Sequence, residues 1–282
     1  MLRYRVVTAL LLIVIFVGGM FVLPAPVLAA WFGVLIGLGA WEWGALAGLG
    51  RGARMGFVLA VMGIGAGLIA ALLVNASHAW LRWPLGVVLI FWAASLVSMV
   101  TDQGEAAAGR GLYGARAGKV MSGFFVLVPL WLSAMYLFVA DIHRPWLLLY
   151  AFSLVWAADT FAYFTGHRFG RHKLAPSVSP GKTIEGVVGG LAGAMLLAAI
   201  AGVAGWKLSG VPLTAWLALA AVSVLVSVLG DLLESKFKRL AGVKDSGNLL
   251  PGHGGVCDRV DAMSAGLPVF ALGWYYVQRL LA

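Results

Sequence analysis

The sequence predicts an all-α protein that crosses a membrane several times. Of its 282 residues, 62% are hydrophobic and only 11% are charged, whereas an ordinary soluble domain is about 45–50% apolar and about 25% charged. A soluble globule of this composition would expose large apolar patches. The apolar residues form continuous runs and not the alternating pattern of barrel strands, so the spanning elements are predicted to be helices.

Nine runs are long enough to cross the bilayer, which takes about 20 apolar residues of helix. We expect one integrated membrane domain, because no polar linker or low-complexity segment divides the chain. Residues 1–119 would hold the first four helices and a loop, and residues 120–282 the other five. The predicted spans are 6–23, 27–49, 56–75, 84–101, 120–140, 146–166, 183–206, 211–233 and 263–281.

The first run has an alternative reading. MLRYR, an apolar run and then VLAA also fit a cleaved secretory signal. We favour a retained helix, because the next apolar run begins directly after Pro26, as expected for a tight hairpin between two helices.

The basic residues predict the orientation. If the N-terminus is inside and nine helices alternate, only four of the 20 Lys and Arg residues lie outside, namely Arg82, Arg144, Lys207 and Arg279. Lys and Arg are enriched in cytoplasmic loops, so the bias predicts an N-in, C-out protein. The same bias accounts for the net charge of +9. No motif for binding DNA or RNA is visible, and we expect no nucleic-acid partner.

Four carboxylates lie inside predicted spans, where charged groups are costly and usually functional. Glu42, Asp159, Glu185 and Asp231 all fall in the cytoplasmic part of their helices, which predicts a polar cavity at the cytoplasmic face. The alternative is that each side chain reaches the interface or pairs with a loop arginine. This alternative is stronger for Glu42, which stands alone between two tryptophans, than for Asp159.

The acids near the C-terminus have the spacing of a cation site. Glu234 and Ser235 follow Asp231 on one helical face, at a helix C-terminus where the dipole disfavours an anion. Asp258 and Asp261 repeat the spacing if the last helix begins early. Carboxylates from two segments predict a binding site for Mg²⁺. The alternative is that these acids belong to a solvated charged loop. The single cysteine excludes a multi-cysteine cluster.

A basic, glycine-rich stretch adjoins these acids. Glycines at 242, 247, 252, 254 and 255 would let backbone N–H groups approach an anion. Acids for a metal beside bases for phosphates suit a polyphosphate substrate. His253 lies among the glycines, and a structural and a catalytic role both stay open. The basic residues are Lys236, Lys238, Arg239, Lys244 and Arg259.

A second polar stretch, residues 161–186, joins two predicted helices on the same side. Ser179 and Pro180 are typical of an N-cap followed by proline in the first helical position. The helix start, carrying Lys182 and Thr183, would direct N–H groups and a cation at a phosphate. The stretch is no Walker A loop, because GKT lacks the upstream glycine.

The run SKFKRLAGVKDSGNLLPGHGGVCDRVD (235–261) resembles the signature of the phosphatidate cytidylyltransferases. The upstream run GHRFGRHKLAPSVSPGKTIEG is also similar to that family, and the N-terminal half resembles it only in general character. Every fixed position of the signature is filled, by Ser235, Lys238, Arg239, Lys244, Asp245, His253, Gly254, Gly255, Asp258, Arg259 and Asp261.

The resemblance implies that CTP and phosphatidic acid react to give CDP-diacylglycerol and pyrophosphate, with Mg²⁺ alone or with a second cation. It also implies a homodimer in a bacterial inner membrane, in contact with membrane lipids, with the site facing the cytoplasm. The expected metal ligands are Asp231, Glu234, Asp258 and Asp261. The expected catalytic residues are Asp231, Lys238, Arg239, Lys244, Asp245, His253, Asp258, Arg259 and Asp261. The expected substrate contacts are Asp159, Ser179, Lys182, Thr183, Glu185, Ser235, Gly254 and Gly255.

Two other kinds of protein share some of these features. An ion-coupled transporter often places its acids near the bilayer midplane between inverted repeats, whereas here they gather at one face and no repeat is seen. A CTP-dependent polyprenol kinase or a CDP-alcohol phosphotransferase would use a different acceptor. The spaced aspartate motif of the phosphotransferases is absent from the sequence.

Overall fold

The computed structural model describes residues 14–75, 77–101, 113–141, 145–249 and 254–280, and these are almost entirely helical. Short helical turns η1 (Ala79–Leu81), η2 (Ala201–Gly205) and η3 (Gln278–Leu280) adjoin the long helices. Seven helical segments of this described part are long and apolar enough to cross a membrane. The long helices are α2 (Ala25–Leu46), α3 (Arg51–Val74), α4 (Arg82–Thr101), α6 (Arg116–Ala140), α7 (Trp146–Phe169), α8 (Ile184–Ile200), α9 (Gly210–Leu240) and α10 (Cys257–Val277).

The seven segments correspond to the second through eighth predicted spans, and they support an all-α polytopic membrane protein. The first predicted span, 6–23, lies partly outside the described residues; of its described part, 14–23, residues 14–22 are helical. The ninth, 263–281, corresponds to α10 and η3, but the helix begins at Cys257. α10 is not among the seven segments, so nine spans stay a prediction.

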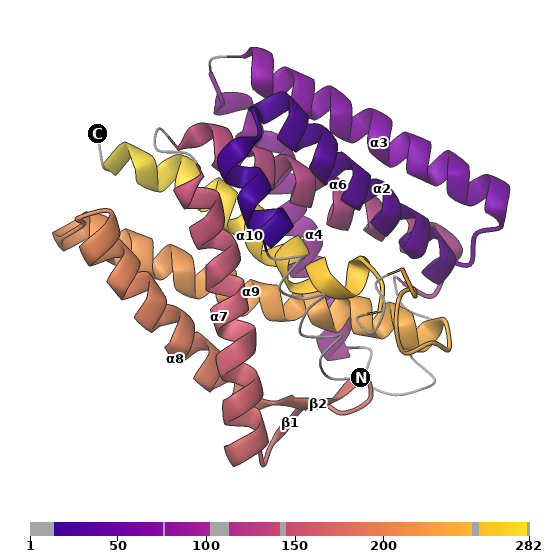
Figure 1. Ribbon diagram of the computed structural model, residues 1–282. Coiled ribbons are helices and arrows are strands. Elements are labelled where there is room, and N and C mark those ends of the chain that lie inside the picture. The colour runs from indigo at the N-terminus through magenta and orange to yellow at the C-terminus, as the bar shows by residue number, and fades with distance from the viewer. Residues whose placement is uncertain (1–13, 76, 102–112, 142–144, 250–253, 281–282) are drawn as a thin grey trace.

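The helices form two groups that meet along α9 and α10 (Figure 1). On one side α2 and α3 run side by side and pack on α6, while on the other α7 packs along α8. α9 and α10 cross the middle and contact each other closely. α6 is the most buried of the seven spans. Large apolar side chains are exposed on α3 and α4, as expected for surfaces that face lipid, among them Leu59, Ile64, Val87, Ile90 and Val97.

Helix α9 extends well beyond its predicted end at residue 233. Good helix formers follow that position, and the helix continues to Leu240. It ends before Gly242, whose φ of +70° suits glycine. Asp231 therefore lies inside the helix. The prediction that it opposes the dipole at a helix C-terminus was wrong.

The polar stretch before α8 forms a small hairpin and not the predicted helix start. β1 (Lys173–Ala175) pairs antiparallel with β2 (Ser179–Thr183). Ser179 is therefore no N-cap; Thr183 is, and its Oγ1 accepts a hydrogen bond of 3.1 Å from the Gly186 amide. Proline is tolerated in β2 because a two-stranded hairpin consists of edge strands.

Glycines bring α8 against α7. A Cβ at Gly190 would lie 2.6 Å from the carbonyl oxygen of Ala158, and one at Gly186 would lie 3.0 Å from that of Ala162. Larger residues would force the helices apart, as is common where small residues line helix contacts in membranes. Gly186 and Gly190 also line the cavity described next.

Candidate functional site

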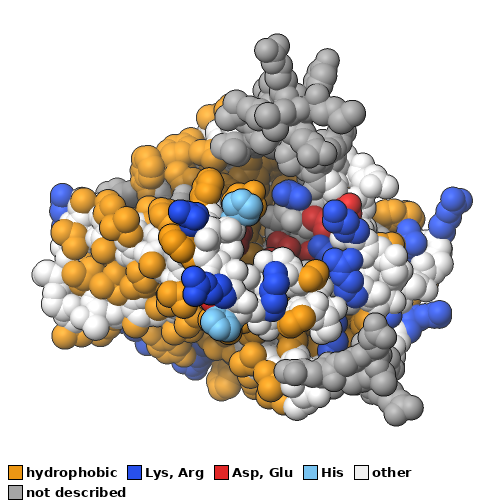
Figure 2. All heavy atoms as spheres, turned by 90° about the horizontal axis from the view of Figure 1, so that it is seen from below, with side chains coloured by type: hydrophobic (Ala, Val, Ile, Leu, Met, Phe, Trp, Pro, Cys, Tyr) orange, Lys and Arg blue, Asp and Glu red, His pale blue; other side chains and the backbone are white. Residues whose placement is uncertain are grey.

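A cavity of about 600 Å³ lies between α7, α8, α9 and the β1–β2 hairpin. Its polar end holds predicted site residues from three elements, α7, β2 and α9, and its lining also includes apolar side chains such as Leu191 and Val224. Figure 2, which views the molecule from the hairpin end, shows Lys, Arg and His side chains around a hollow that contains acidic groups. The predicted residues lining the cavity are Asp159, Ser179, Lys182, Thr183 and Asp231.

An ion pair marks the polar end of the cavity. Lys182 Nζ from β2 lies 2.5 Å from Asp231 Oδ2 of α9, and both side chains are about one-quarter exposed. The Ser235 hydroxyl, one turn further along α9, donates to Asp231 Oδ1 at 3.2 Å. Asp159 approaches the same cavity from α7. The cavity thus presents a cation and two carboxylates.

Glu185, predicted as a substrate contact, instead supports the hairpin. Its carboxylate accepts hydrogen bonds from the amides of Arg171 and His172, and it lies 2.6 Å from His172 Nδ1. It is not among the residues that line the cavity. Its contacts fix the loop that leads into β1, and thereby the strand that carries Lys182.

A second group of charges is enclosed beside the cavity. Lys238 Nζ lies 3.0 Å from Glu234 Oε2 and 2.7 Å from Asp258 Oδ1. The side chains are only 11%, 2% and 7% exposed, respectively. Lys238 was predicted to neutralise substrate phosphates, but here it joins a carboxylate of α9 to one of α10.

The second oxygen of Asp258 organises the glycine-rich loop before α10. Oδ2 accepts hydrogen bonds from the amides of Ser246 at 2.9 Å and Gly255 at 2.8 Å, and from the Ser246 hydroxyl at 2.9 Å. Burial alone would raise the pKa of Asp258, but the hydrogen bonds from Lys238, Gly255 and Ser246 outweigh it and hold that pKa below its usual value.

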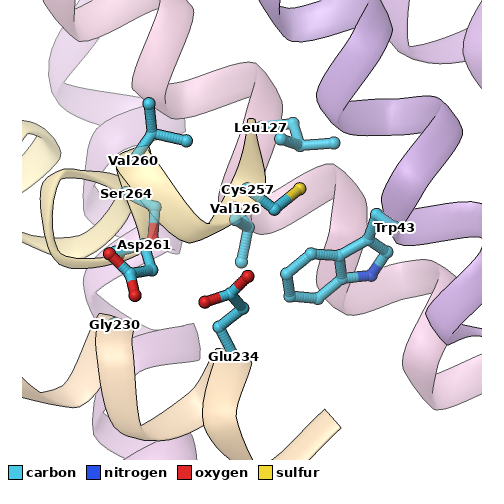
Figure 3. Close-up of a pocket in the computed structure, with 9 residues that line it drawn as sticks. All are labelled: Trp43, Val126, Leu127, Gly230, Glu234, Cys257, Val260, Asp261 and Ser264. Carbon is cyan, nitrogen blue, oxygen red and sulfur yellow. The ribbon is translucent and has the colours of Figure 1, made fainter. Parts of the chain in front are cut away.

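Two other predicted metal ligands face each other across a very small pocket of about 10 Å³ (Figure 3). Asp261 of α10 and Glu234 of α9 direct their carboxyl groups into it. Oε1 of Glu234 is buried and has no hydrogen-bond partner among the described residues. Within the same part of the chain, no three His, Cys, Asp or Glu side chains are grouped closely enough to hold a metal ion.

The remaining signature residues are more exposed. Arg239 Nε donates to the carbonyl oxygen of Val178 at 3.3 Å, which ties α9 to the hairpin turn. Lys244, Asp245 and Arg259 lie on the surface. His253 lies outside the described residues, so its role stays open.

Glycines of the signature lie close to carboxylates of the protein itself. A Cβ at Gly254 would lie 2.7 Å from Asp258 Oδ2, and one at Gly255 would lie 2.5 Å from Glu42 Oε2. A Cβ at Gly247 would also collide with the Glu42 carboxylate. Contact of the signature glycines with a substrate anion stays a prediction.

The sequence indicated Glu42 only as one of four carboxylates in predicted spans, and it did not single out Ser246. Glu42 is 5% exposed, forms no ion pair with an arginine of the described residues, and contacts the glycine-rich loop. The signal was present as a lone carboxylate in an apolar helix. Ser246 contacts both Glu42 and Asp258, and only its place inside the signature could have indicated this.

The fold and the site define a class: a polytopic helical membrane protein with paired acids and bases at one end of its bundle, suited to a phosphorylated substrate. The model of the family described as "Cytidylyltransferase family" matches residues 3–277. The chain therefore belongs to the cytidylyltransferase family.

Curated relatives agree with this assignment. A phosphatidate cytidylyltransferase of Pseudomonas aeruginosa is 41% identical over 280 residues, which are 96% of each chain. One of Haemophilus influenzae is 35% identical over 98% of this chain and 100% of its own. One of Staphylococcus haemolyticus is 46% identical over 125 residues, or 43% of this chain and 46% of its own.

Proposed function

We propose that the protein transfers the cytidylyl group of CTP to phosphatidic acid, giving CDP-diacylglycerol and pyrophosphate. The observation that carries the proposal is the cavity between α7, α8 and α9, with Lys182 and Asp231 at its polar end and apolar side chains along its wall. Such a cavity suits a substrate that has both phosphate and hydrocarbon parts. The two relatives that match almost the whole chain bear the name of this activity.

In the proposed reaction an oxygen of the lipid phosphate attacks the α-phosphorus of CTP. A P–O bond forms to that phosphorus as the bond to the β-phosphate oxygen breaks, and pyrophosphate leaves with the electron pair. The attacking phosphate is already anionic near neutral pH, so no strong general base is needed. Catalysis then depends on positioning the two substrates and balancing their charges.

The basic residues divide by their surroundings. Lys182 faces the cavity and would contact a substrate phosphate once its ion pair with Asp231 breaks. Arg239, Lys244 and Arg259 are exposed and would neutralise the CTP phosphates. Lys238 is enclosed by two carboxylates, so we assign it to holding those acids in place.

The acids fit a divalent cation in their chemistry. Carboxylate oxygens are the ligands that Mg²⁺ prefers, and Glu234 offers a buried oxygen without a partner among the described residues. Glu234 and Asp261, which face one small pocket, would hold the ion, and Asp231 would join them only by moving closer than it lies in the structure. Asp258 is already engaged by Lys238 and the loop amides. When bound, the ion would supply charge neutralisation at the reacting phosphates.

The proposed setting is a bacterial inner membrane, with nine spans, the N-terminus inside and the site at the cytoplasmic face. The distribution of Lys and Arg supports this orientation. CTP is made in the cytoplasm, which requires the same placement. A homodimer is expected from the family resemblance alone.

The activity is tested with purified protein, CTP, Mg²⁺ and phosphatidic acid in mixed micelles, by following CDP-lipid and pyrophosphate. We expect stoichiometric formation of both. Asp231→Asn should abolish turnover without unfolding the protein, while Ser133→Ala, a buried change on α6 away from the cavity, should leave it unchanged. Failure of folded wild-type protein to form product with several acyl chains would refute the proposal. Product with polyprenol in place of phosphatidic acid would identify the rival kinase activity.

The orientation is tested by labelling cysteines introduced at exposed positions. Cys257 itself is buried and is replaced by serine. An impermeant maleimide added to intact cells should label a cysteine at Lys207, between α8 and α9, but not one at Lys173 in the hairpin; both positions are exposed. The reverse pattern would overturn the N-in arrangement. Chemical cross-linking in native membranes checks the homodimer.

A further inference from the structure

Glu42 is a buried carboxylate that the reaction outlined above does not use. It lies near the C-terminal end of α2, is 5% exposed and stands far in sequence from the signature. Burying a carboxylate without partners is costly, so its contacts should account for its presence.

Those contacts all lead to the loop and helix that carry Asp258. Glu42 Oε2 accepts a hydrogen bond of 2.9 Å from the amide of Cys257, the first residue of α10, and lies 3.2 Å from the Ser246 hydroxyl, whose one proton it shares with Asp258 Oδ2. The thiol of Cys257 contacts the carbonyl oxygen of Gly39, also on α2, at 3.2 Å. One turn of α2 thus contacts both Ser246 and Cys257.

The loop in turn is shaped to receive this carboxylate. A Cβ at Gly255 would lie 2.5 Å from Glu42 Oε2, and one at Gly247 would collide with Oε1. Any larger residue at either position would displace the carboxylate or the loop. Two glycines of the signature therefore serve the fit of Glu42.

The connection from Glu42 to the candidate site passes through Ser246. The Ser246 hydroxyl lies 3.2 Å from Glu42 Oε2 and 2.9 Å from Asp258 Oδ2. Asp258 in turn contacts Lys238 at 2.7 Å. The chain of contacts runs from an N-terminal helix to the charged group beside the cavity without a gap.

We infer that Glu42 is a positioning residue, which fixes the glycine-rich loop and the start of α10 and thereby the direction of the Asp258 carboxylate. Its role follows from the hydrogen bond that it accepts from the Cys257 amide, from its contact with the Ser246 hydroxyl and from a close fit, and needs no contact with substrate. The effect on turnover rests on the proposed function; the effect on the loop does not.

The test combines turnover with the reactivity of Cys257, the single cysteine of the chain. Cys257 is 2% exposed, so its rate of reaction with a small maleimide in detergent reports whether the loop is held. The variants are Glu42→Ala, Glu42→Gln and Ser246→Ala. Asp141→Asn is the matched control, because Asp141 is also buried and also binds an N–H of a first helical turn, that of Leu147 in α7.

In Glu42→Ala we expect labelling to accelerate about tenfold or more, and kcat to fall about tenfold or more while KM for CTP changes little, as misplacement of a reacting group predicts. Glu42→Gln keeps an acceptor oxygen and should stay within about threefold of wild type in both measurements. Ser246→Ala should lower kcat, and combining it with Glu42→Ala should add little, because both act through one connection. Asp141→Asn should leave the labelling of Cys257 unchanged.

Protection of Cys257 in Glu42→Ala equal to that in wild type would overturn the inference. So would wild-type kcat in that variant, or Glu42→Gln labelling as fast as Glu42→Ala. If wild-type protein forms no product, the proposed function fails, while the labelling rates still decide whether Glu42 holds the loop.

Discussion

Lys238 allows a quantitative test of the enclosed charge cluster. Its ammonium group lies 2.7 Å from Asp258 Oδ1 and 3.0 Å from Glu234 Oε2. With an effective dielectric constant of about 20, each contact represents roughly 6 kcal/mol of attraction. Most of this offsets the cost of removing three charges from water, so the net loss on breaking the cluster should be about 3–5 kcal/mol.

Lys238→Met removes the charge and keeps most of the side-chain volume, leaving two carboxylates buried without their cation. We expect the free energy of unfolding to fall by about 3–5 kcal/mol. The double variant Lys238→Met/Glu234→Gln also removes a negative charge, and it should regain much of the lost free energy of unfolding. The matched control is Lys182→Met, whose ion pair with Asp231 is about one-quarter exposed and should contribute no more than about 1 kcal/mol.

The measurement is an SDS titration of each variant in mixed micelles, followed by tryptophan fluorescence. The reasoning fails if Lys238→Met unfolds at the same SDS concentration as wild type, or if the double variant is no more stable than the single one. Either result would mean that Lys238 does not stabilise the buried carboxylates of Glu234 and Asp258.

Three further predictions concern separate parts of the site. Gly230→Ala would place a methyl group against the carbonyl oxygen of Asp261 where α9 and α10 cross. We expect the free energy of unfolding to fall by about 1–3 kcal/mol and most activity to be lost. The control Gly63→Ala, in open space on α3, should be neutral in the same SDS titration. Thr183→Val removes the N-cap of α8 and should cost about 0.5–2 kcal/mol, while Thr183→Ser should not; equal unfolding of the two would contradict the capping role. EDTA should stop pyrophosphate release and added Mg²⁺ restore it; full turnover in EDTA would refute the metal assignment.

The membrane class of the protein could be predicted because it depends only on composition and on the lengths of apolar runs. The ends of the helices could not be predicted where polar residues continue a helix beyond its apolar run. Hydropathy falls after residue 233, yet α9 continues to Leu240, since Glu, Lys and Arg are good helix formers. Likewise α10 begins at Cys257, and this places Asp258 and Asp261 one turn apart on one helix.

The composition of the candidate site could be predicted, but not its internal arrangement. The sequence shows acids and bases in one signature and does not show which of them meet. In the structure Lys182 and Asp231 face the cavity, whereas Lys238 joins Glu234 to Asp258 away from it. This division depends on the crossing of α9 and α10 and on the hairpin, both of which are long-range features.

The length of α9 has a consequence for the lipid substrate. Its 31 residues rise about 46 Å, whereas the hydrocarbon core is about 30 Å thick. In the proposed orientation the first two-thirds of the helix span the hydrocarbon, and the last three turns, with Asp231 and Lys238, lie at the depth of the lipid head groups. A phosphatidic acid molecule can then present its phosphate to the acids while its acyl chains stay in the leaflet. Only the water-soluble nucleotide has to travel, and the finished lipid can diffuse away sideways without ever having left the bilayer.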